Sequence, residues 1–419
     1  MSGVADGVAA IAGRARATAW TLATLDTATR DAALRAAADA VEHAATEILA
    51  ANGADLDAAR DGGMRGALLD RLTLTGARVA AMAGGLRDIA ALPDPVGEVL
   101  EEWDRPNGLR IRRVRVPLGV VAVIYEARPN VTSDVAGLCL KSGNAAILRG
   151  SSSALRSNSA VVDTIRGALR DSGVPRDAVQ LVPDTSRDAA LALMRLRGQV
   201  DLLVPRGGRA LIEEIVENAT VPFVIDGDGN CHVYVDASAD LAMAARIVVN
   251  AKASKPSVCN SAEKLLVAET VADVFLPRVA TELVAAGVTL RGDARARALV
   301  PGMDEAVDAD WDTEYLDLVM AVRVVAGVDE AIAHVRAHGS GHTEAIVAGD
   351  ESVARRFVEG CPSAVVMVNA STRFTDGGEF GYGAEIGNST QRLHARGPMG
   401  VRELTTYRIE VWGDGQVRE

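Results

Sequence analysis

The 419-residue chain has few aromatic residues, few cysteines and no long apolar run. Aromatic side chains make up only 3% of the residues, so the interior must be built mainly from aliphatic side chains. Proteins that hold single-stranded nucleic acid stack bases on aromatic rings, and this composition argues against that function. The net charge of −12, without a block of five consecutive basic residues, also disfavours a duplex-binding surface. No apolar segment reaches the roughly 18 residues that cross a bilayer. We therefore expect neither a nucleic-acid partner nor a membrane segment.

The four cysteines are widely scattered and form no Cys-x-x-Cys pair. The N-terminal segment carries Asp6, Arg14 and Arg16 within its apolar stretch, which is not typical of a secretory signal. These features predict a cytoplasmic protein with reduced thiols.

Short motifs of nucleotide and metal sites are missing as well. There is no Gly-x-Gly-x-x-Gly, no P-loop and no His-Glu-x-x-His. His334, His338 and His342 are spaced by four residues, but Gly339 and Gly341 interrupt any helix that would align them. We predict no metal site, and a nucleotide would have to bind at a less obvious loop.

What the chain does contain is a regular alternation of helices and strands. Residues 1–92 are alanine-rich and predict helices, including one whose apolar face runs from 32 to 49. Pro93 and Pro95 end this region, because proline removes a backbone donor and clashes with the preceding turn. Residues 376–387 are dense in glycine and predict irregular backbone, whereas 401–411 predict an extended segment.

The central part of the chain predicts an α/β protein. Helices are expected at about 131–140, 154–169, 189–196 and from 209, between strands at 120–125, 145–148, 179–182, 202–204, 265–267, 319–325 and 345–347. Strands that are apolar throughout imply a parallel sheet covered on both faces. The predicted fold class is therefore a Rossmann-like, doubly wound domain followed by a second α/β unit.

Two loops at strand ends are candidate phosphate sites. A guanidinium, a glycine and hydroxyls before a helix suit a phosphate, although a simple serine N-cap explains the first loop equally well. Two such loops in one sheet favour a dinucleotide. The candidate cofactor residues are Arg149, Ser151 and Ser152 in the first loop and Arg206, Gly207 and Gly208 in the second.

Cys259 stands out among the cysteines as a candidate nucleophile. Its neighbours are small or polar and include Lys255, a setting that suits a thiolate, whereas Cys139 lies in an apolar helix pattern. Cys231 and Cys361 fit structural positions better. His394, in a polar loop, is a candidate base for Cys259, although a surface histidine is the commoner explanation.

Several long segments resemble the γ-glutamyl phosphate reductase (glutamate-5-semialdehyde dehydrogenase) family of the aldehyde dehydrogenase superfamily. They are residues 117–120, 125–132, 139–144, 204–208, 231–236, 256–260, 371–378 and 394–400. The resemblance covers the chain from about residue 70 to its C-terminus. It implies an aldehyde-dehydrogenase-like fold with three parts. These are an NADP(H)-binding domain at 1–256, a catalytic domain at 257–380 and an oligomerisation flap built from 104–118 with about 398–419.

The resemblance also implies a reaction. NADPH would reduce L-glutamyl 5-phosphate to L-glutamate 5-semialdehyde through a Cys259 thioester, as a step of proline biosynthesis. Whether glutamate 5-kinase is a physical partner stays open from the sequence. Asn130 and the Cys259 backbone N–H would hold the oxyanion, and Glu314 would orient the nicotinamide ribose. Arg149 and Ser151 would lie near the 2′-phosphate.

The substrate residues implied in this way are Arg128, Arg373, Ser389, Thr390 and His394. Three positions depart from the family pattern: Ser254 replaces glutamine, Lys255 replaces arginine and Asn388 replaces isoleucine. These departures bear on the fine geometry around the thiol.

Three other functions stay open from the sequence. A hydrolytic aldehyde dehydrogenase would need a glutamate that activates water, and the corresponding segment, 226–231, has none. A cysteine hydrolase or acyltransferase would pair Cys259 with His394 and need no nicotinamide cofactor. A catalytically inactive scaffold would not require an intact Cys259 and Asn130.

Overall fold

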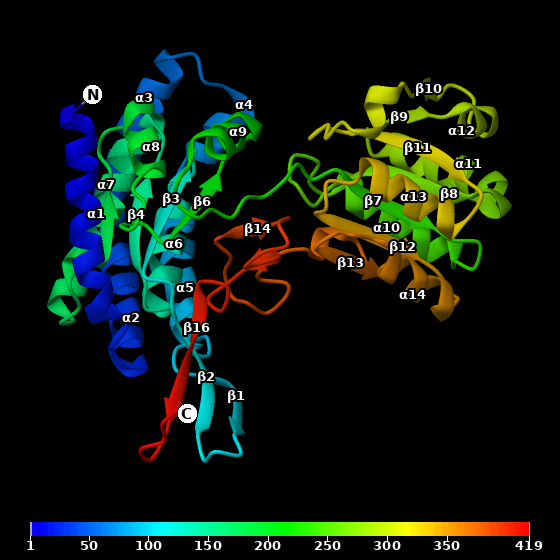
Figure 1. The fold of residues 1–419 in the computed structure, drawn as a ribbon. Coiled ribbons are helices and arrows are strands. Elements are labelled where there is room, and N and C mark those ends of the chain that lie inside the picture. Colours follow the sequence, from blue (N-terminus) through cyan, green and yellow to red (C-terminus); the bar gives the residue numbers. More distant parts are fainter. Residues whose placement is uncertain (1, 419) are drawn as a thin grey trace. The chain divides into compact units, whose positions relative to one another are not determined.

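The computed structural model describes residues 2–418, which divide into two compact units (Figure 1). The first unit holds the described residues up to Ile225, together with Gly381–Gly387 and those from Met399 onward. The second unit comprises Asp226–Phe380 and Asn388–Pro398.

The first unit is built on a parallel sheet of four strands. Its strand order is β5-β4-β3-β6, with β3 at Val120–Tyr125, β4 at Ala145–Arg149, β5 at Val179–Leu181 and β6 at Leu202–Arg206. Every side chain of β3 is buried, as expected for a strand covered on both faces. The carboxyl ends of β3, β4 and β6 lie at one edge, where open α/β sheets bind ligands.

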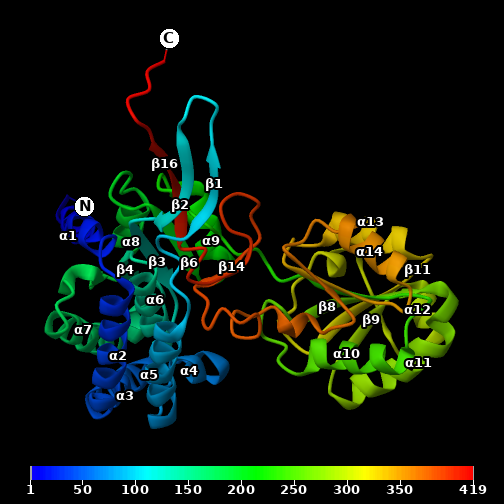
Figure 2. The same ribbon diagram turned by 90° about the horizontal axis from the view of Figure 1, so that it is seen from below.

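Helices cover both faces of this sheet (Figures 1 and 2). Helices α1 and α8 lie on one face, and α6 and α7, backed by α2 and α5, lie on the other. Their bounds are α1 Ser2–Leu22, α2 Thr27–His43, α3 Ala45–Asp61, α4 Gly66–Leu72, α5 Gly76–Ala91, α6 Asn130–Lys141, α7 Leu155–Asp171, α8 Arg187–Met194 and α9 Arg209–Asn218. Two short 3₁₀ helices, η1 at Ser152–Ala154 and η2 at Arg176–Ala178, complete the set.

A three-stranded antiparallel sheet projects from the first unit (Figure 1). It consists of β1 (Val99–Asp104), β2 (Arg110–Pro117) and β16 (Thr405–Trp412), with β2 in the centre. The arginines of β2 pair across the strands with acidic residues of β1, as between Arg113 and Glu101. This sheet corresponds to the predicted flap, but its hairpin begins at Val99, earlier than the predicted start at 104.

The second unit contains a parallel sheet in the order β10-β9-β11-β8-β7-β12-β13. The strands are β7 Cys231–Val235, β8 Ala262–Ala268, β9 Thr289–Gly292, β10 Asp304–Glu305, β11 Val319–Val325, β12 Thr343–Val347 and β13 Val365–Val368. Helices α10 (Leu241–Ala253), α11 (Glu269–Ala285) and α12 (Ala294–Leu299) pack on one face. Helices α13 (Val328–His338) and α14 (Glu351–Gly360) pack on the other (Figure 2). The 3₁₀ helices are η3 Asp308–Trp311 and η4 Thr372–Phe374, and the strands β14 (Gly387–Ser389) and β15 (Gly397–Met399) pair with each other.

Two further boundaries differ from the sequence predictions. The helix expected through 32–49 is two helices, α2 and α3, which meet at Ala44. The division between the units falls at Ile225, not at the predicted 256/257, because β7 pairs with β8 and β12 of the second sheet. The seven predicted strands are all present, but β7 at 231–235 was not among the predicted strands, so the sequence analysis began the second unit too late in the chain.

Within residues 2–418, no helix combines the length and the apolar character that a membrane crossing requires.

Candidate active site

Cys259 lies in the loop that joins α10 to β8 in the second unit. These residues, 254–261, are called the nucleophile loop after their candidate nucleophile, whose side chain is partly exposed. Burial raises the pKa of the Cys139 thiol to about 12 and that of the Cys231 thiol well above its ordinary value. The pKa of Cys361 is raised as well, mainly by burial. Because the thiolate is the reactive form, these three thiols are poor nucleophiles, and Cys259 remains the candidate.

The segment 226–230 packs directly against the Cys259 backbone. A Cβ atom at Gly229 would lie 1.8 Å from the Cys259 carbonyl oxygen, so no side chain fits there. That carbonyl accepts a hydrogen bond from the Cys231 thiol at 3.2 Å. The Gly229 N–H donates to the Glu314 carboxylate at 2.8 Å. Because residue 229 is glycine, the backbone before β7 can lie against the Cys259 backbone and also donate a hydrogen bond to Glu314.

Charged side chains of β8 hold the segment that carries Glu314. The Lys264 ammonium donates to the carbonyl of Thr313 at 2.7 Å and lies over the Tyr315 ring, 4.7 Å from its centroid. Glu263, paired with the buried Lys252 at 2.7 Å, accepts from the backbone N–H of Leu316 at 3.3 Å. The position of Glu314 is thus fixed on both sides.

Burial raises the pKa of Glu314 to about 7, and the charge of Asp228 adds to this, while the hydrogen bond from Gly229 opposes it. A carboxyl with a raised pKa binds a proton in the folded state that the unfolded chain has already released. Its contribution to stability therefore falls as the pH rises from 4.5 to about 7, and stays unfavourable above that.

Glu314→Gln should relieve this cost while its amide oxygen still accepts from Gly229. We expect the melting temperature of the variant, relative to wild type, to be higher at pH 8 than at pH 5 by about 2 °C or more. Thermal unfolding at both pH values measures this. Glu359→Gln, at an exposed position of α14, is the control and should show no such pH dependence. An equal effect of Glu314→Gln at both pH values would contradict a buried, partly protonated carboxyl.

Arg373 lies beside the nucleophile loop through Asn260. The Arg373 guanidinium donates to the Asn260 side-chain oxygen and, from Nε, to the Ser254 hydroxyl at 3.3 Å. The Asn260 amide in turn donates to the carbonyl of Thr375 at 2.9 Å. Ser254, one of the three departures from the family pattern, is therefore a direct neighbour of a predicted substrate residue.

Thr390 contacts the neighbouring segment 226–230. Its hydroxyl accepts from the Gly227 N–H at 3.0 Å, while Ser389 is buried in β14. His394 is exposed and has a left-handed backbone, with φ of 71°. The predicted residues Cys259, Glu314, Arg373 and Thr390 thus all adjoin the segments 226–230 and 254–261.

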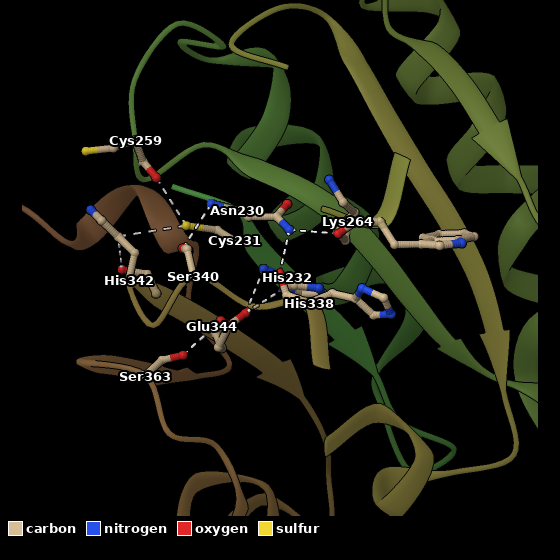
Figure 3. Close-up of polar contacts among 12 residues, drawn as sticks. Asn230, Cys231, His232, Cys259, Lys264, His338, Ser340, His342, Glu344 and Ser363 are labelled. Carbon is tan, nitrogen blue, oxygen red and sulfur yellow. Dashed lines mark hydrogen bonds and ion pairs between the residues drawn. The ribbon is translucent and has the colours of Figure 1, made fainter. Parts of the chain in front are cut away.

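The histidine next to Cys259 is His342, which sequence reasoning did not assign to the site. One ligand-type atom from each of Asp226, Cys259 and His342 lies within 4.8 Å of the others, and His394 does not belong to this group. Figure 3 shows the side chains of Cys259 and His342 on the same side of Cys231. Burial lowers the pKa of His342 to about 4, so the imidazole is neutral near pH 7. No sequence signal pointed to it, because His342 precedes β12 and only the sheet brings it to the nucleophile loop.

The other two histidines with this four-residue spacing, His334 and His338, pack against each other in and at the end of α13. Helix α13 ends at His338, and Gly339 follows it, so His342 lies outside the helix as expected. His334 is buried against Trp311 and His338, and burial lowers its pKa to about 2. A second buried contact joins His232 to Glu344 at 3.0 Å (Figure 3).

In the first unit, the two predicted phosphate loops follow β4 and β6. The Arg149 guanidinium donates to the backbone carbonyls of Thr185 and Ser186 at 2.6 and 3.1 Å. Burial lowers its pKa, although the Asp184 carboxylate opposes the shift. The Ser151 hydroxyl contacts that of Ser153 at 2.8 Å rather than capping the helix that follows.

The second loop, Arg206–Gly208, packs closely against Glu126, the residue that follows β3. The Glu126 carboxylate accepts from the Gly208 N–H at 2.9 Å, and a Cβ at Gly207 would lie 2.9 Å from the same oxygen. Gly208 precedes α9, which has no side-chain cap, and Arg206 lies next to Gly387, with a guanidinium nitrogen 3.1 Å from where a Cβ would stand. Both loops therefore present helix N-termini without side-chain caps, which suit an anion.

Asn130 begins α6 at the carboxyl end of β3 and is exposed. Its amide donates to the Asp134 carboxylate at 3.2 Å. Burial raises the pKa of Asp134 to about 6, and the hydrogen bond from Asn130 opposes that shift. Arg128 is half-buried two residues before Asn130. The candidate residues thus form two groups, a thiol group in the second unit and a loop group in the first.

Two parallel α/β units, with uncapped helix N-termini after strands of one and a partly exposed thiol in the other, are the arrangement expected of the aldehyde dehydrogenase class of fold. The model of the aldehyde dehydrogenase family matches residues 2–298. An acetylating aldehyde dehydrogenase from Geobacillus thermoglucosidasius, 18% identical, has the same fold with a TM-score of 0.70, covering 100% of this chain and 98% of that one. The predicted fold class is confirmed.

Relatives of higher identity show which family of this superfamily the chain belongs to. The γ-glutamyl phosphate reductase of Thermobifida fusca is 55% identical over 418 residues, which cover all of both chains. That of Moorella thermoacetica is 55% identical over 406 residues, 97% of each chain. The crystal structure of the Thermotoga maritima γ-glutamyl phosphate reductase superposes with a TM-score of 0.97 at 47% identity, covering 98% of this chain and 100% of that one. The chain belongs to the γ-glutamyl phosphate reductase family, and the predicted resemblance is confirmed. It is therefore an oxidoreductase.

Proposed function

We propose that the chain reduces L-glutamyl 5-phosphate to L-glutamate 5-semialdehyde with release of phosphate, as a step in proline biosynthesis. The family membership just described supports this reaction. The observation that carries the mechanism is Cys259, a partly exposed thiol, whereas burial raises the pKa of each of the other three cysteines.

The Cys259 thiolate attacks the acyl carbon, the bond to the phosphate oxygen breaks, and a thioester forms on the protein. The phosphate leaves as an anion, so no strong general acid is needed. The Asn130 amide and the Cys259 backbone N–H stabilise the developing oxyanion. Loss of one such donor typically lowers the rate by about 10²–10³-fold. After reduction, the thiohemiacetal releases the aldehyde and restores the Cys259 thiolate.

Family members use a nicotinamide cofactor, and we propose NADPH for this chain. Bound NADPH supplies the hydride that reduces the thioester. The loop residues Arg149, Ser151 and Ser152 bind the 2′-phosphate side, and Arg206, Gly207 and Gly208 line the second loop. The uncapped N-termini after β4 and β6 fit anionic groups of this kind. Glu314 orients the nicotinamide ribose as a hydrogen-bond acceptor.

For the amino-acid end of the substrate we propose Arg373, Ser389 and Thr390, with Arg128 and His394 as further contacts. Two observations support this group. Arg373 is anchored to Asn260, next to the nucleophile, and Thr390 touches the 226–230 segment through Gly227. A guanidinium at that position suits the α-carboxylate.

The reverse reaction tests the proposed chemistry. Reduction of NADP⁺ with glutamate 5-semialdehyde should depend strictly on inorganic phosphate, because phosphate must attack the Cys259 thioester. The segment 226–231 contains no glutamate that would activate water instead. We expect a rate at least about 10²-fold lower without phosphate. Equal rates with and without phosphate would replace this proposal with the hydrolytic aldehyde dehydrogenase, and absence of NADPH binding would favour the cysteine hydrolase.

We also propose that the chain forms a homo-oligomer through the sheet β1-β2-β16. Three residues that alternate along β16, namely Tyr407, Ile409 and Val411, are more than half exposed, which leaves an apolar face on that strand. A physical association with glutamate 5-kinase would hand over the labile acyl phosphate. The four free cysteines support a reducing, cytoplasmic location.

A further inference from the structure

Three side chains with different donor atoms converge beside the proposed nucleophile. They are the Asp226 carboxylate, the Cys259 thiol and the His342 imidazole, and their nearest donor atoms lie within 4.8 Å of one another. A sulfur, an imidazole nitrogen and a carboxylate oxygen are the three ligand types that zinc takes in proteins. The group combines residues from the start of the second unit, the nucleophile loop and the approach to β12.

The hydrogen bonds around His342 fix which ring nitrogen faces the group. The Thr343 hydroxyl donates its only proton to the Thr375 hydroxyl at 2.9 Å. It must therefore accept from Nδ1–H of His342, which lies 2.8 Å away. Nε2 then carries the lone pair. Metal-binding histidines commonly have this arrangement, in which the other ring nitrogen donates to a neighbouring oxygen.

The lone pair of Nε2 is aimed at a carboxylate rather than at a donor. Nε2 is buried and, among the residues that the structure describes, has no hydrogen-bond partner; it lies 3.7 Å from an Asp226 oxygen. Two facing acceptors at this distance repel each other unless a proton or a cation lies between them. In a tetrahedral zinc site, nitrogen and oxygen ligands at about 2.0–2.1 Å from the ion are about 3.3 Å apart. The observed separation exceeds this by only a few tenths of an ångström.

We propose that Asp226, Cys259 and His342 form a binding site for a thiophilic divalent cation of the Zn²⁺ type. Binding would release the Cys259 thiol proton to solvent and leave a fourth position open to water. The ion would occupy the sulfur lone pair that attacks the substrate, so it would inhibit the enzyme reversibly. Binding itself is independent of the proposed function, whereas the inhibition rests on it.

Metal binding can be measured without any activity assay. Chelator-treated full-length protein is titrated with Co²⁺, and the sulfur-to-cobalt charge-transfer absorption is recorded. Zn²⁺ affinity is then measured by competition with a chromophoric chelator. We expect one ion per chain and a charge-transfer band that is absent in Cys259→Ala. His342→Ala and Asp226→Asn should weaken Zn²⁺ binding by about tenfold or more.

Cys361→Ala is the matched control, because Cys361 is also a partly exposed free thiol but lies outside the group. This variant should bind Zn²⁺ as wild type does. His342→Gln, which keeps much of the side-chain volume, guards against misfolding of the alanine variant, and both are checked by thermal unfolding. Zn²⁺ binding that survives in Cys259→Ala and in folded His342→Gln, or no stoichiometric binding to wild type, would overturn the proposal.

Activity then separates the two proposals. If wild type is active, Zn²⁺ should inhibit it and a chelator should restore the full rate. If the protein binds Zn²⁺ but has no reductase activity, the proposed metal site is supported and the proposed function is contradicted. Full activity in the presence of a bound, stoichiometric Zn²⁺ would contradict the inhibitory role of the site.

Discussion

Replacement of Cys259 by alanine is expected to lower kcat by about 10⁴-fold or more, because the proposed thioester forms on the Cys259 sulfur and alanine has no nucleophilic atom. The remaining cysteines cannot substitute for it, since burial raises the pKa of all three thiols. NADPH binding should change little, because the proposed cofactor loops lie in the first unit and Cys259 lies in the second. Steady-state rates and NADPH fluorescence titration measure the two effects separately.

Cys361→Ala is the control for this experiment. Cys361 follows the last residue of α14 and is a partly exposed thiol like Cys259, but it lies outside the group formed by Asp226, Cys259 and His342. It should retain most of the wild-type rate. Residual activity of Cys259→Ala above about 1% of wild type would exclude a covalent role for this residue.

Gly229→Ala should be the most damaging change that removes no functional group. The new Cβ would lie 1.8 Å from the Cys259 carbonyl oxygen and 2.5 Å from its Cα, so the backbone must move by more than an ångström. Misplacement of a reacting group by about 1 Å can cost about 10²-fold in rate. We expect kcat to fall by about 10²-fold or more, together with a lower melting temperature.

Backbone preference does not explain this effect. The φ angle of Gly229 is not in the left-handed region, so alanine is excluded by space alone. Gly53→Ala provides the comparison, because Gly53 lies within α3 with nothing near the position of a Cβ. That change should leave the rate unaltered and stabilise the helix by about 1 kcal/mol. If Gly229→Ala kept the wild-type rate, the close contact between this segment and the nucleophile loop would not matter for catalysis.

Much of the fold was predictable because local pattern and final environment agree. The strand expected at 319–325 is β11 at Val319–Val325, and the helix expected at 154–169 is α7 at Leu155–Asp171. β11 is apolar apart from Arg323, and α7 is strongly amphipathic, so each pattern is recognisable without knowledge of the elements that pack against it. The prediction that the first helical region ends at Pro93 also agrees with the structure, in which α5 ends at Ala91, because proline cannot continue a helix.

Predictions were weaker where partners in space decide the outcome. Nothing in the local sequence distinguishes β7 from the strands of the first unit, yet it pairs with β8 and β12. Apolar spacing through 32–49 suggested one helix, but the chain turns at Ala44, so that α2 packs against both α5 and α7 and α3 continues along α7 as a separate helix. In both cases the choice depends on contacts between segments that are distant in sequence.

The sequence by itself determined the α/β class, the family and Cys259 as the candidate nucleophile. These rest on patterns and strings that lie within short stretches of the chain. Only the tertiary structure placed His342 and Asp226 beside the thiol, fixed the imidazole tautomer through Thr343 and Thr375, and showed why residue 229 must be glycine. The physical reason is that donor geometry and close backbone contacts arise where the ends of separate strands lie side by side in one sheet. The local sequence does not show which strand ends become neighbours.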